Sequence, residues 1–336
     1  MLPTLFLMTL SAQYRIAEQT EDGIPVQVLV DEAHQMEVRI AASIGHNAYS
    51  LRIKGRELLW TPFARFSEAK AKPALFGNPF LAPWANRIDG LSYWVHGRER
   101  KLDPAKGNLR LDSNGNPIHG LVLYTDQWKI VERSAGARGA RLRSRLEFHR
   151  VPDWMAQFPF PHAIEMTYYL SDGQLEILTE IENLGDEPMP VAIGYHPYYR
   201  LKGGRDAWTV EIAARQQLEL SPRLIPTGRR RAVDRRQLPL KGAQLDDVYT
   251  DLIRNERGEA EFGLTNGQQK LTFAFGPQYP VGVIYAPAGR EFICFEPMSA
   301  ITDAFNQHHR GRYADLTFIP AGGRWKESWW IRPSGF

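Results

Sequence analysis

The chain has 336 residues, of which 43% are hydrophobic and 24% are charged, values typical of a globular protein rather than a disordered or fibrous one. Its formal net charge of +3 is too small to indicate nucleic acid or an anionic membrane as a partner. The single cysteine excludes an internal disulfide framework, a cysteine-rich zinc site and a CxxC redox pair.

The amino-terminal segment 2–10 (LPTLFLMTL) is a candidate targeting sequence. Its apolar core is about long enough for the h-region of a signal peptide, which would make the protein periplasmic or secreted. No Lys or Arg precedes this segment and Pro3 interrupts it. We therefore expect residues 1–12 to be an extension or a first strand, with the chain starting at Met1 or Met8, and the protein to be cytoplasmic. No run reaches the roughly 18 apolar residues of a membrane helix, so no membrane partner is expected.

Apolar and polar residues alternate with a period of two along the whole chain, as in residues 26–30, 142–148 and 175–182. In the last of these segments, Leu175, Ile177 and Ile181 face one way and Glu176, Glu180 and Glu182 the other. This pattern predicts half-buried antiparallel strands. Clusters of Gly, Asn, Asp and Pro between such runs, for example at 113–117 and 172–173, predict the turns that join them.

Many short strand-like runs without a Pro/Gly/Ser-rich linker predict a single all-β domain over residues 1–336, built as a large antiparallel β-sandwich. The absence of a fixed repeat argues against a propeller. Residues 301–310 (ITDAFNQHHR) predict a short helical turn.

The motifs GxSxG, GxGxxG, GxxxxGK and HExxH are absent, which disfavours a nucleophile-elbow serine, a nucleotide cradle and a helical zinc site. The adjacent His308 and His309 cannot both face one metal ion on regular structure, so we expect them to be exposed. We expect neither a cofactor nor a metal.

Two polar residues stand in unusual surroundings near the first third of the chain. Arg87 lies among apolar neighbours in PWANRI, where a guanidinium must be paired or presented to a ligand because burying a bare charge is costly. A structural ion pair is the alternative. His119 follows a turn and precedes Gly120, so it can point into a cleft, but it can equally be an ordinary core or surface histidine.

His196 in GYHPYY and Glu296 in FICFEP share a local design, because each is a titratable residue in apolar surroundings directly before a proline. The residue before proline favours extended geometry, so we expect both at strand ends. A His and a Glu held in this way make a general acid and a general base. Glu296 with Asp246 or Asp247 as a glycosidase carboxylate pair is an alternative.

Two further segments are polar. The LDDVY segment at 245–249 could bind sugar hydroxyls or form a turn. Five arginines occur between residues 229 and 236; such a run is usually a solvated face, but it could also hold a phosphate.

Six short motifs occur in the order found in aldose 1-epimerases, or galactose mutarotases: NRI (86–88), PIHGL (117–121), GYHPYYRL (194–201), LIPTG (224–228), LDD (245–247) and FEP (295–297). The resemblance covers nearly the whole chain. It implies a galactose-mutarotase-type β-sandwich with a sugar cleft on one sheet. It also implies interconversion of the α and β anomers of a free aldose such as glucose or galactose without a cofactor. We expect the protein to be a monomer or a homodimer.

The resemblance also implies roles for individual residues. Glu296 matches the family's catalytic base and His196 its catalytic acid. The substrate-binding positions it implies are Asn86, Arg87, His119 and Asp246, with the adjacent Asp247 as an alternative to the last. In this mechanism Glu296, as a carboxylate, takes the proton of the C1 hydroxyl, and His196, as an imidazolium whose pKa a neighbouring carboxylate raises, protonates the ring oxygen.

Two departures from the family pattern leave the preferred sugar open. Leu121 stands where the family often has a second glycine after His-Gly, and Asp247 where it often has His or Asn. A hexose-6-phosphate mutarotase and a non-catalytic sugar-binding protein on the same fold remain alternatives. Cys294, two residues before Glu296, is expected to serve packing rather than chemistry.

Overall fold

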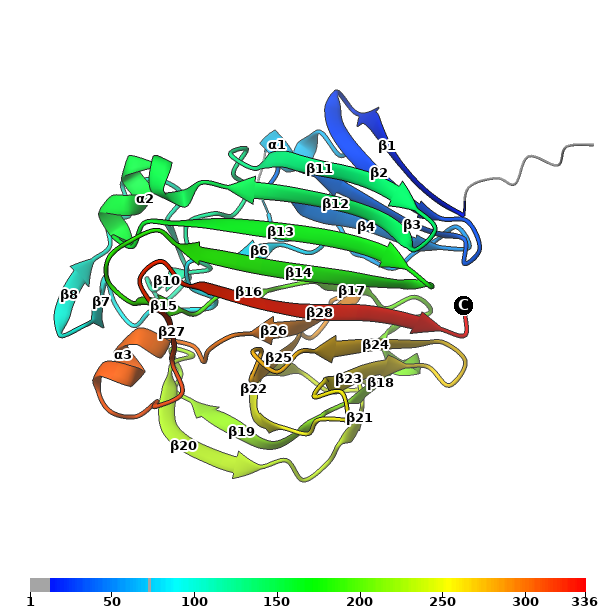
Figure 1. Ribbon diagram of the computed structural model, residues 1–336. Coiled ribbons are helices and arrows are strands. Elements are labelled where there is room, and N and C mark those ends of the chain that lie inside the picture. The colour runs from blue at the N-terminus through cyan, green and yellow to red at the C-terminus, as the bar shows by residue number, and fades with distance from the viewer. Residues whose placement is uncertain (1–12, 72–73) are drawn as a thin grey trace, which may run out of the picture.

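The computed structural model describes residues 13–71 and 74–336. The described residues form antiparallel β-sheets with a few short helices (Figure 1), which confirms the predicted all-β class. The signal-like segment 2–10 lies outside these residues.

The largest sheet has nine strands, all antiparallel to their neighbours, and runs in Figure 1 from β11 near the top to β21 near the bottom. In order across the sheet, the strands are β11 (Lys129–Gly136), β12 (Gly139–Leu146), β13 (His162–Ser171), β14 (Gln174–Asn183), β28 (Arg324–Ser334), β24 (Lys270–Phe275), β23 (Ala260–Thr265), β18 (Thr209–Glu211) and β21 (Gln237–Pro239). Strand β14 buries Leu175, Ile177 and Ile181 and leaves its glutamates half-buried, as its alternation predicts.

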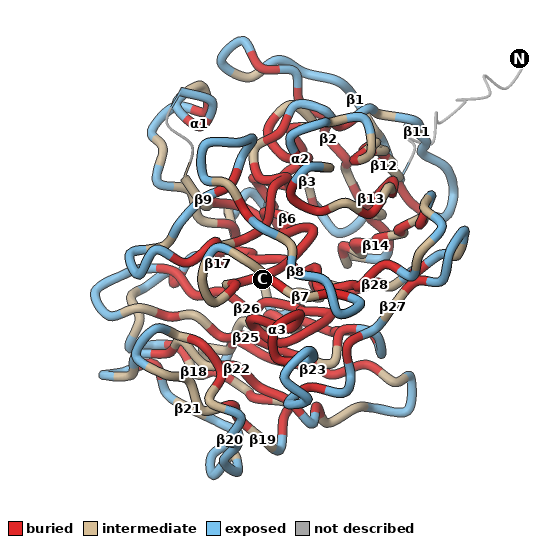
Figure 2. The backbone as a smooth tube through the Cα atoms, turned by 90° about the vertical axis from the view of Figure 1, so that its left-hand side faces the viewer, coloured by how far each residue is buried: buried red, intermediate tan, exposed pale blue. Residues whose placement is uncertain are grey.

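A second sheet has eight strands and is also antiparallel throughout. In order, its strands are β20 (Pro226–Ala232), β19 (Ala214–Leu220), β22 (Leu245–Leu252), β25 (Val281–Ala286), β26 (Phe292–Met298), β16 (Gly194–Tyr195) and β6 (Phe80–Leu81). The eighth strand, β17 (Tyr198–Arg200), also pairs with β26, further along it than β16 does. Exposed residues gather in loops and at edge strands such as β20, whereas β25 and β26 are buried (Figure 2).

The two large sheets pack face to face through aromatic rings. Phe295 of β26 stacks on Phe273 of β24 with 4.3 Å between ring centroids. Tyr195 of β16 lies 5.3 Å from Trp329 of β28. These contacts make the predicted sandwich, because one face of each sheet is removed from water by the other.

A third sheet contains the five strands β1 (Tyr14–Glu21), β2 (Ile24–Asp31), β3 (Met36–Ala41), β4 (Asn47–Ile53) and β5 (Arg56–Glu57). The prediction that residues 26–30 form a half-buried strand is wrong in its burial, because Gln27 and Leu29 are buried as well as Val26 and Val28. Leu29 joins the main core, whereas the two valines join a separate apolar cluster with Phe66. Both faces of β2 are therefore covered.

The remaining elements are short. Three two-stranded ladders pair β7 (Ser92–Val95) with β8 (Arg98–Lys101), β9 (Arg110–Leu111) with β10 (Pro117–Ile118), and β15 (Met189–Val191) with β27 (Thr317–Ile319). The helices are α1 (Glu68–Ala71), η1 (Phe148–Arg150), α2 (Pro152–Gln157), η2 (Arg205–Ala207) and α3 (Ala304–His309).

Helix α3 confirms the helical turn predicted within 301–310, and His308 and His309 at its end are exposed as expected. The alternation over 142–148 extends too far, because β12 ends at Leu146 and Phe148 begins η1. Across residues 13–71 and 74–336, the helices are all too short or too polar to cross a bilayer.

Candidate active site

Strand β26 has two different faces, since successive side chains of a strand point in opposite directions. Phe295 points into the sandwich core. Cys294 and Glu296 therefore lie on the opposite face of the sheet, the face turned away from the nine-stranded sheet. We call this the outer face of the eight-stranded sheet.

The strand register places Asp246 on the outer face as well. Asp246 of β22 pairs with Tyr285 of β25, and Tyr285 pairs with Cys294 of β26. Residues directly opposite each other in a ladder share a face, so these three side chains form one row. Glu296 belongs to the adjacent row, opposite Val283.

Asp247 lies on the other face of β22. Its Oδ1 accepts a hydrogen bond from Gln217 Nε2 at 2.5 Å, and its Oδ2 accepts one from the Tyr249 hydroxyl at 3.3 Å. Tyr249 belongs to the core between the sheets. Of the two adjacent aspartates, Asp246 is thus the one that shares a face with Glu296.

His196 comes from a break in the sheet. Strand β26 pairs with β16 at Met298 and with β17 from Cys294 to Phe292. The chain between β16 and β17, which holds His196 and Pro197, bridges that interval and places His196 Nε2 3.3 Å from Glu296 Oε1. His196 thus follows a strand end as predicted, but Glu296 lies inside β26 and the prediction of a strand end is wrong there.

A glycine permits the break. An ideal Cβ on Gly194 would lie 2.1 Å from Met298 Sδ, closer than the two atoms can approach. A side chain at position 194 would therefore push β16 away from β26 and move His196 with it.

The His119 side chain enters the same site from a separate loop. His119 has a φ of 64° and its backbone N–H donates to the Asn86 carbonyl at 2.8 Å. Gly120 follows with a φ of 70°, and an ideal Cβ there would lie 2.0 Å from the Ala82 carbonyl oxygen. The ring centroids of His119 and His196 are 5.3 Å apart, so the structure brings these two histidines together.

Arg87 forms an ion pair with Asp112, which is the alternative to ligand binding that the sequence left open. Its Nε donates to Asp112 Oδ2 at 2.7 Å. Asp112 Oδ1 also accepts the backbone N–H groups of Asn114 and Asn116 at 2.8 and 2.9 Å. Burial alone would raise the pKa of Asp112, but these hydrogen bonds and the Arg87 guanidinium lower it.

Arg87 also acts on the site. Burial raises the pKa of both Glu296 and Asp246, and the positive charge of Arg87 counteracts that rise in each case. Asp246 in turn contributes to the raised pKa of Glu296. The guanidinium and the two carboxyl groups therefore lie close enough to interact through space. Asn86 contributes its backbone carbonyl to His119, and its own side chain is buried.

The protonation states differ from the expected ones. Burial lowers the pKa of His196 to about 3, whereas a raised value was expected, and it raises the pKa of Glu296 well above its usual range. Burial also lowers the pKa of His119 well below its usual value, with His196 and Arg87 as further causes. Burial disfavours the charged form of every one of these groups, and this effect exceeds the attraction between His196 and Glu296. The proton of the pair therefore resides on Glu296.

Several polar atoms of the site point at no hydrogen-bonding partner. Within the described residues, His119 Nδ1, His196 Nδ1 and Glu296 Oε2 are buried without one. A buried polar group without a partner costs about 1–3 kcal/mol. Three of them at one place indicate a site that a polar ligand completes.

Cys294 brings a third donor atom to the pair. Its sulfur, a ring nitrogen of His196 and a carboxylate oxygen of Glu296 all lie within 4.8 Å of one another. The set offers one soft and two harder ligands. From the sequence, Cys294 was expected to serve packing only. Its side chain does pack with Tyr198 and Phe292.

Three residues at the site were not assigned a role from the sequence. Tyr198 stacks on His196 at 4.7 Å with an angle of 8° between the rings, and Tyr285 meets His196 edge-on at 5.8 Å. Asp112 orients Arg87. The aromatic residues around GYHPYY signalled the first of these, but no local pattern links Asp112 or Tyr285 to the site.

The five arginines between 229 and 236 lie on or after edge strand β20. Arg229 forms an exposed ion pair with Glu219. Arg231 Nε donates to Gln217 Oε1 at 3.3 Å, beside Asp247 and away from the outer face. These two side chains are therefore not directed at the His196–Glu296 pair.

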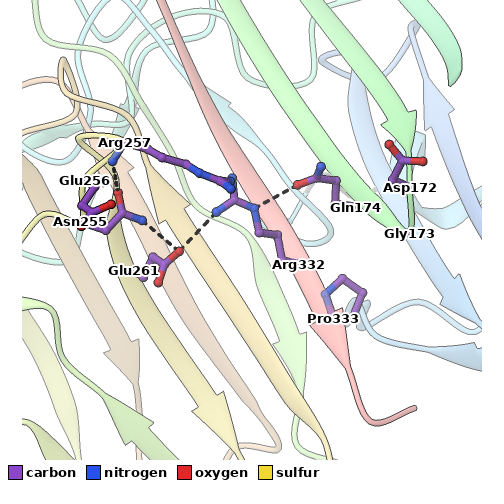
Figure 3. Close-up of a pocket in the computed structure, with 9 residues that line it drawn as sticks. All are labelled: Asp172, Gly173, Gln174, Asn255, Glu256, Arg257, Glu261, Arg332 and Pro333. Carbon is purple, nitrogen blue, oxygen red and sulfur yellow. Dashed lines mark hydrogen bonds and ion pairs between the residues drawn. The ribbon is translucent and has the colours of Figure 1, made fainter. Parts of the chain in front are cut away.

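A surface cavity of about 640 Å³ lies elsewhere (Figure 3). Its lining residues are Asp172, Gly173, Gln174, Asn255, Glu256, Arg257, Glu261, Arg332 and Pro333. Arg332 there donates to Gln174 at 2.9 Å, to Glu261 at 3.3 Å and to Glu259 at 2.7 Å. Of the two arginines that line this cavity, Arg332 is thus paired with the chain's own carboxylates.

Comparison with known proteins agrees with this geometry. A family model described as aldose 1-epimerase matches residues 26–328. The uncharacterised Escherichia coli K12 protein YphB is 23% identical over 261 residues, which cover 72% of this chain and 78% of YphB.

Solved structures show the same fold. A galactose mutarotase-like protein from Clostridium acetobutylicum superposes with a TM-score of 0.84 at 19% identity, covering 96% of this chain and 99% of its own. Galactose 1-epimerase from Lactobacillus acidophilus superposes with a TM-score of 0.74 at 16% identity, covering 96% and 99%. At these identities the likeness concerns the fold, whereas the family match covers most of the sequence. The chain belongs to the aldose 1-epimerase family.

Proposed function

We propose that this protein is an aldose 1-epimerase that interconverts the α and β anomers of a free aldose. The observation that carries the proposal is the buried contact of His196 Nε2 with Glu296 Oε1 at 3.3 Å, with the second polar atom of each side chain, Glu296 Oε2 and His196 Nδ1, buried without a partner. An acid and a base side by side are what ring opening needs, because it removes a proton from the C1 hydroxyl and adds one to the ring oxygen.

The pair needs only one proton for this chemistry. Buried and empty of sugar, it holds that proton on Glu296. Transfer across the 3.3 Å contact gives a carboxylate and an imidazolium with the same proton count. Polar groups of a bound sugar stabilise this charged form by replacing the missing solvent. Glu296 then takes the C1 hydroxyl proton, His196 protonates the ring oxygen, and rotation about C1–C2 before reclosure gives the other anomer.

The surrounding side chains position the sugar. The Arg87 guanidinium, held by Asp112, donates to sugar oxygens, and the Asp246 carboxylate accepts from hydroxyls. His119, whose low pKa keeps it neutral, can donate to or accept from a hydroxyl without adding charge. Tyr198, stacked flat on His196, restricts the rotation of the imidazole.

Polarimetry of freshly dissolved α-glucose and α-galactose tests the proposal. The wild-type protein should accelerate the change in optical rotation, and Glu296→Gln should lower kcat about 10²–10⁴-fold, the usual contribution of a general base. Asp247→Asn is the matched control, since it makes the same carboxyl-to-amide change on the opposite face of the sheet. Sugar binding without faster mutarotation, or an active Glu296→Gln variant, would contradict the proposal.

A phosphorylated aldose is the second candidate substrate, supported by Arg110. This exposed residue lies over the Tyr124 ring at 5.4 Å, and its charge contributes to the low pKa of His119, so it is near the sugar site. A cation there suits an anionic substituent. Glucose and glucose 6-phosphate should be compared at two salt concentrations, in the wild type and in Arg110→Gln. A preference for the phosphate that salt and Arg110→Gln both remove would establish this substrate.

A further inference from the structure

We propose that His196, Cys294 and Glu296 form a binding site for a thiophilic divalent cation, with Zn²⁺ as the fitting ion, and that this ion excludes the sugar. The site uses the acid–base pair of the proposed function plus a cysteine that the mutarotation mechanism does not need. Metal binding itself does not depend on that function; the inhibition that it causes does.

The donor atoms are already near the spacing that zinc requires. Two ligands about 2.0–2.1 Å from a tetrahedral zinc ion lie about 3.3 Å apart. His196 Nε2 and Glu296 Oε1 are 3.3 Å apart. The Cys294 sulfur lies within 4.8 Å of a ring nitrogen of His196 and a carboxylate oxygen of Glu296, so a movement of about 1 Å brings it near the roughly 3.5 Å that a Zn–S bond of about 2.3 Å demands.

The chemistry of the three donors selects the ion. A thiolate, an imidazole and a carboxylate together favour Zn²⁺ over Mg²⁺ or Ca²⁺, which take oxygen ligands. Three protein ligands leave the fourth tetrahedral position open to water.

All three donor side chains are buried. The side chain of Cys294 is buried between its row neighbours Tyr198 and Tyr285. The ion displaces the thiol proton and the proton shared by the pair, so two protons leave as one Zn²⁺ binds. The doubly charged ion is thereby held by two anionic ligands and one neutral ligand.

Occupation by zinc and turnover of sugar exclude each other. Zinc takes the imidazole lone pair and the carboxylate oxygen that the proton transfer uses. Cys294 is outside that proton transfer, so removing its sulfur separates the two properties: zinc affinity falls while mutarotation continues.

Calorimetric titration of the chelator-treated full chain with ZnSO₄, incubated to equilibrium, tests the binding. We expect one equivalent in the wild type and an affinity at least about 100-fold lower in Cys294→Ser, which removes one of three ligands. The control is the double variant His308→Ala/His309→Ala, which removes an exposed pair of histidines on α3 and should leave affinity and stoichiometry unchanged. No stoichiometric binding, or binding that follows the histidine pair rather than Cys294, would overturn the proposal.

Two further readouts identify the ligands and the competition. Cobalt(II) in place of zinc should give a thiolate-to-cobalt charge-transfer band in the wild type but not in Cys294→Ser. Saturating aldose should weaken apparent zinc affinity, and zinc should slow mutarotation reversibly in the wild type but far less in Cys294→Ser. Zinc binding with the cobalt band in a chain that has no mutarotase activity would leave the metal site standing and refute the proposed function alone. A wild-type chain without the cobalt band would refute the metal site.

Discussion

Four buried histidines make the folded protein sensitive to mild acid. His46, His119, His162 and His196 are each buried. Burial lowers the pKa of His46 to about 3, of His162 to about 4 and of His196 to about 3, and it places that of His119 well below its usual value. Between pH 6.5 and 5.5 these rings stay neutral when folded but take up protons when the chain unfolds.

The size of the effect follows from linkage. A histidine with an unfolded pKa of about 6.5 that stays neutral in the folded state loses about 1 kcal/mol of stabilisation as the pH falls from 6.5 to 5.5. The four together lose about 4 kcal/mol. Glu296, whose folded pKa is raised, keeps a proton that the unfolded chain releases and offsets at most about 1.4 kcal/mol. The free energy of unfolding should therefore fall by about 3 kcal/mol over this single pH unit.

Urea unfolding at pH 6.5 and 5.5 measures the loss directly, and His162→Phe isolates one contribution. In the wild type the rings of His162 and Phe148 stack with 4.1 Å between their centroids. A phenyl ring at position 162 can keep this stack but cannot take up a proton. The variant should lose about 1 kcal/mol less than the wild type between the two pH values. His309→Phe is the control, since His309 is an exposed ring stacked on Trp94 at 4.5 Å, and it should lose as much as the wild type. Equal losses in wild type and His162→Phe would refute the reasoning.

Three other outcomes are expected. Gly120→Ala should destabilise the chain by about 3 kcal/mol in urea unfolding, because its Cβ would lie 2.0 Å from the Ala82 carbonyl oxygen at a φ of 70°; a loss below about 1 kcal/mol would show that the loop relaxes. Asp246→Asn should raise KM for a free aldose about 10–100-fold through loss of charge-assisted hydrogen bonds, whereas Asp247→Asn should leave KM unchanged; equal effects would mean that the outer face is not the sugar site. The pH profile of kcat/KM should stay flat from pH 6.5 to 5.5, because burial lowers the pKa of the acid–base histidine to about 3; a fall by half or more over that range would indicate an ordinary exposed histidine.

The local patterns of the sequence predict the strands well where one face is wet. In β14 half-buried and buried residues alternate along the whole strand, with Leu175, Ile177 and Ile181 on the buried face. Strand β2 differs because both of its faces are covered: Leu29, on the face that the pattern would leave to water, joins the main core, while Val26 and Val28 join a second apolar cluster. The periodicity of a strand shows which side chains share a face, but it does not show what another part of the chain packs against the opposite face.

The candidate site, too, is predictable from the sequence in part only. His196 and Glu296 stand out in the sequence because titratable residues in apolar surroundings need a reason, and the motif order adds their neighbours. The choice between Asp246 and Asp247 depends on ladder register, since a shift of one residue exchanges the two faces. The protonation states depend on burial by residues distant in sequence, which is why the expected direction for His196 is wrong.

The Asp112 carboxylate performs two tasks with its two oxygen atoms: one accepts the backbone N–H groups of the 113–116 turn and the other the Arg87 guanidinium. The shape of this surface turn is thereby connected to the guanidinium at the proposed sugar site through a single side chain. Insertions or deletions in the turn, which surface loops usually tolerate, would here rotate Arg87 and change which hydroxyls it meets. Under the proposed function, a change in the length of this turn would therefore alter sugar preference without touching His196 or Glu296.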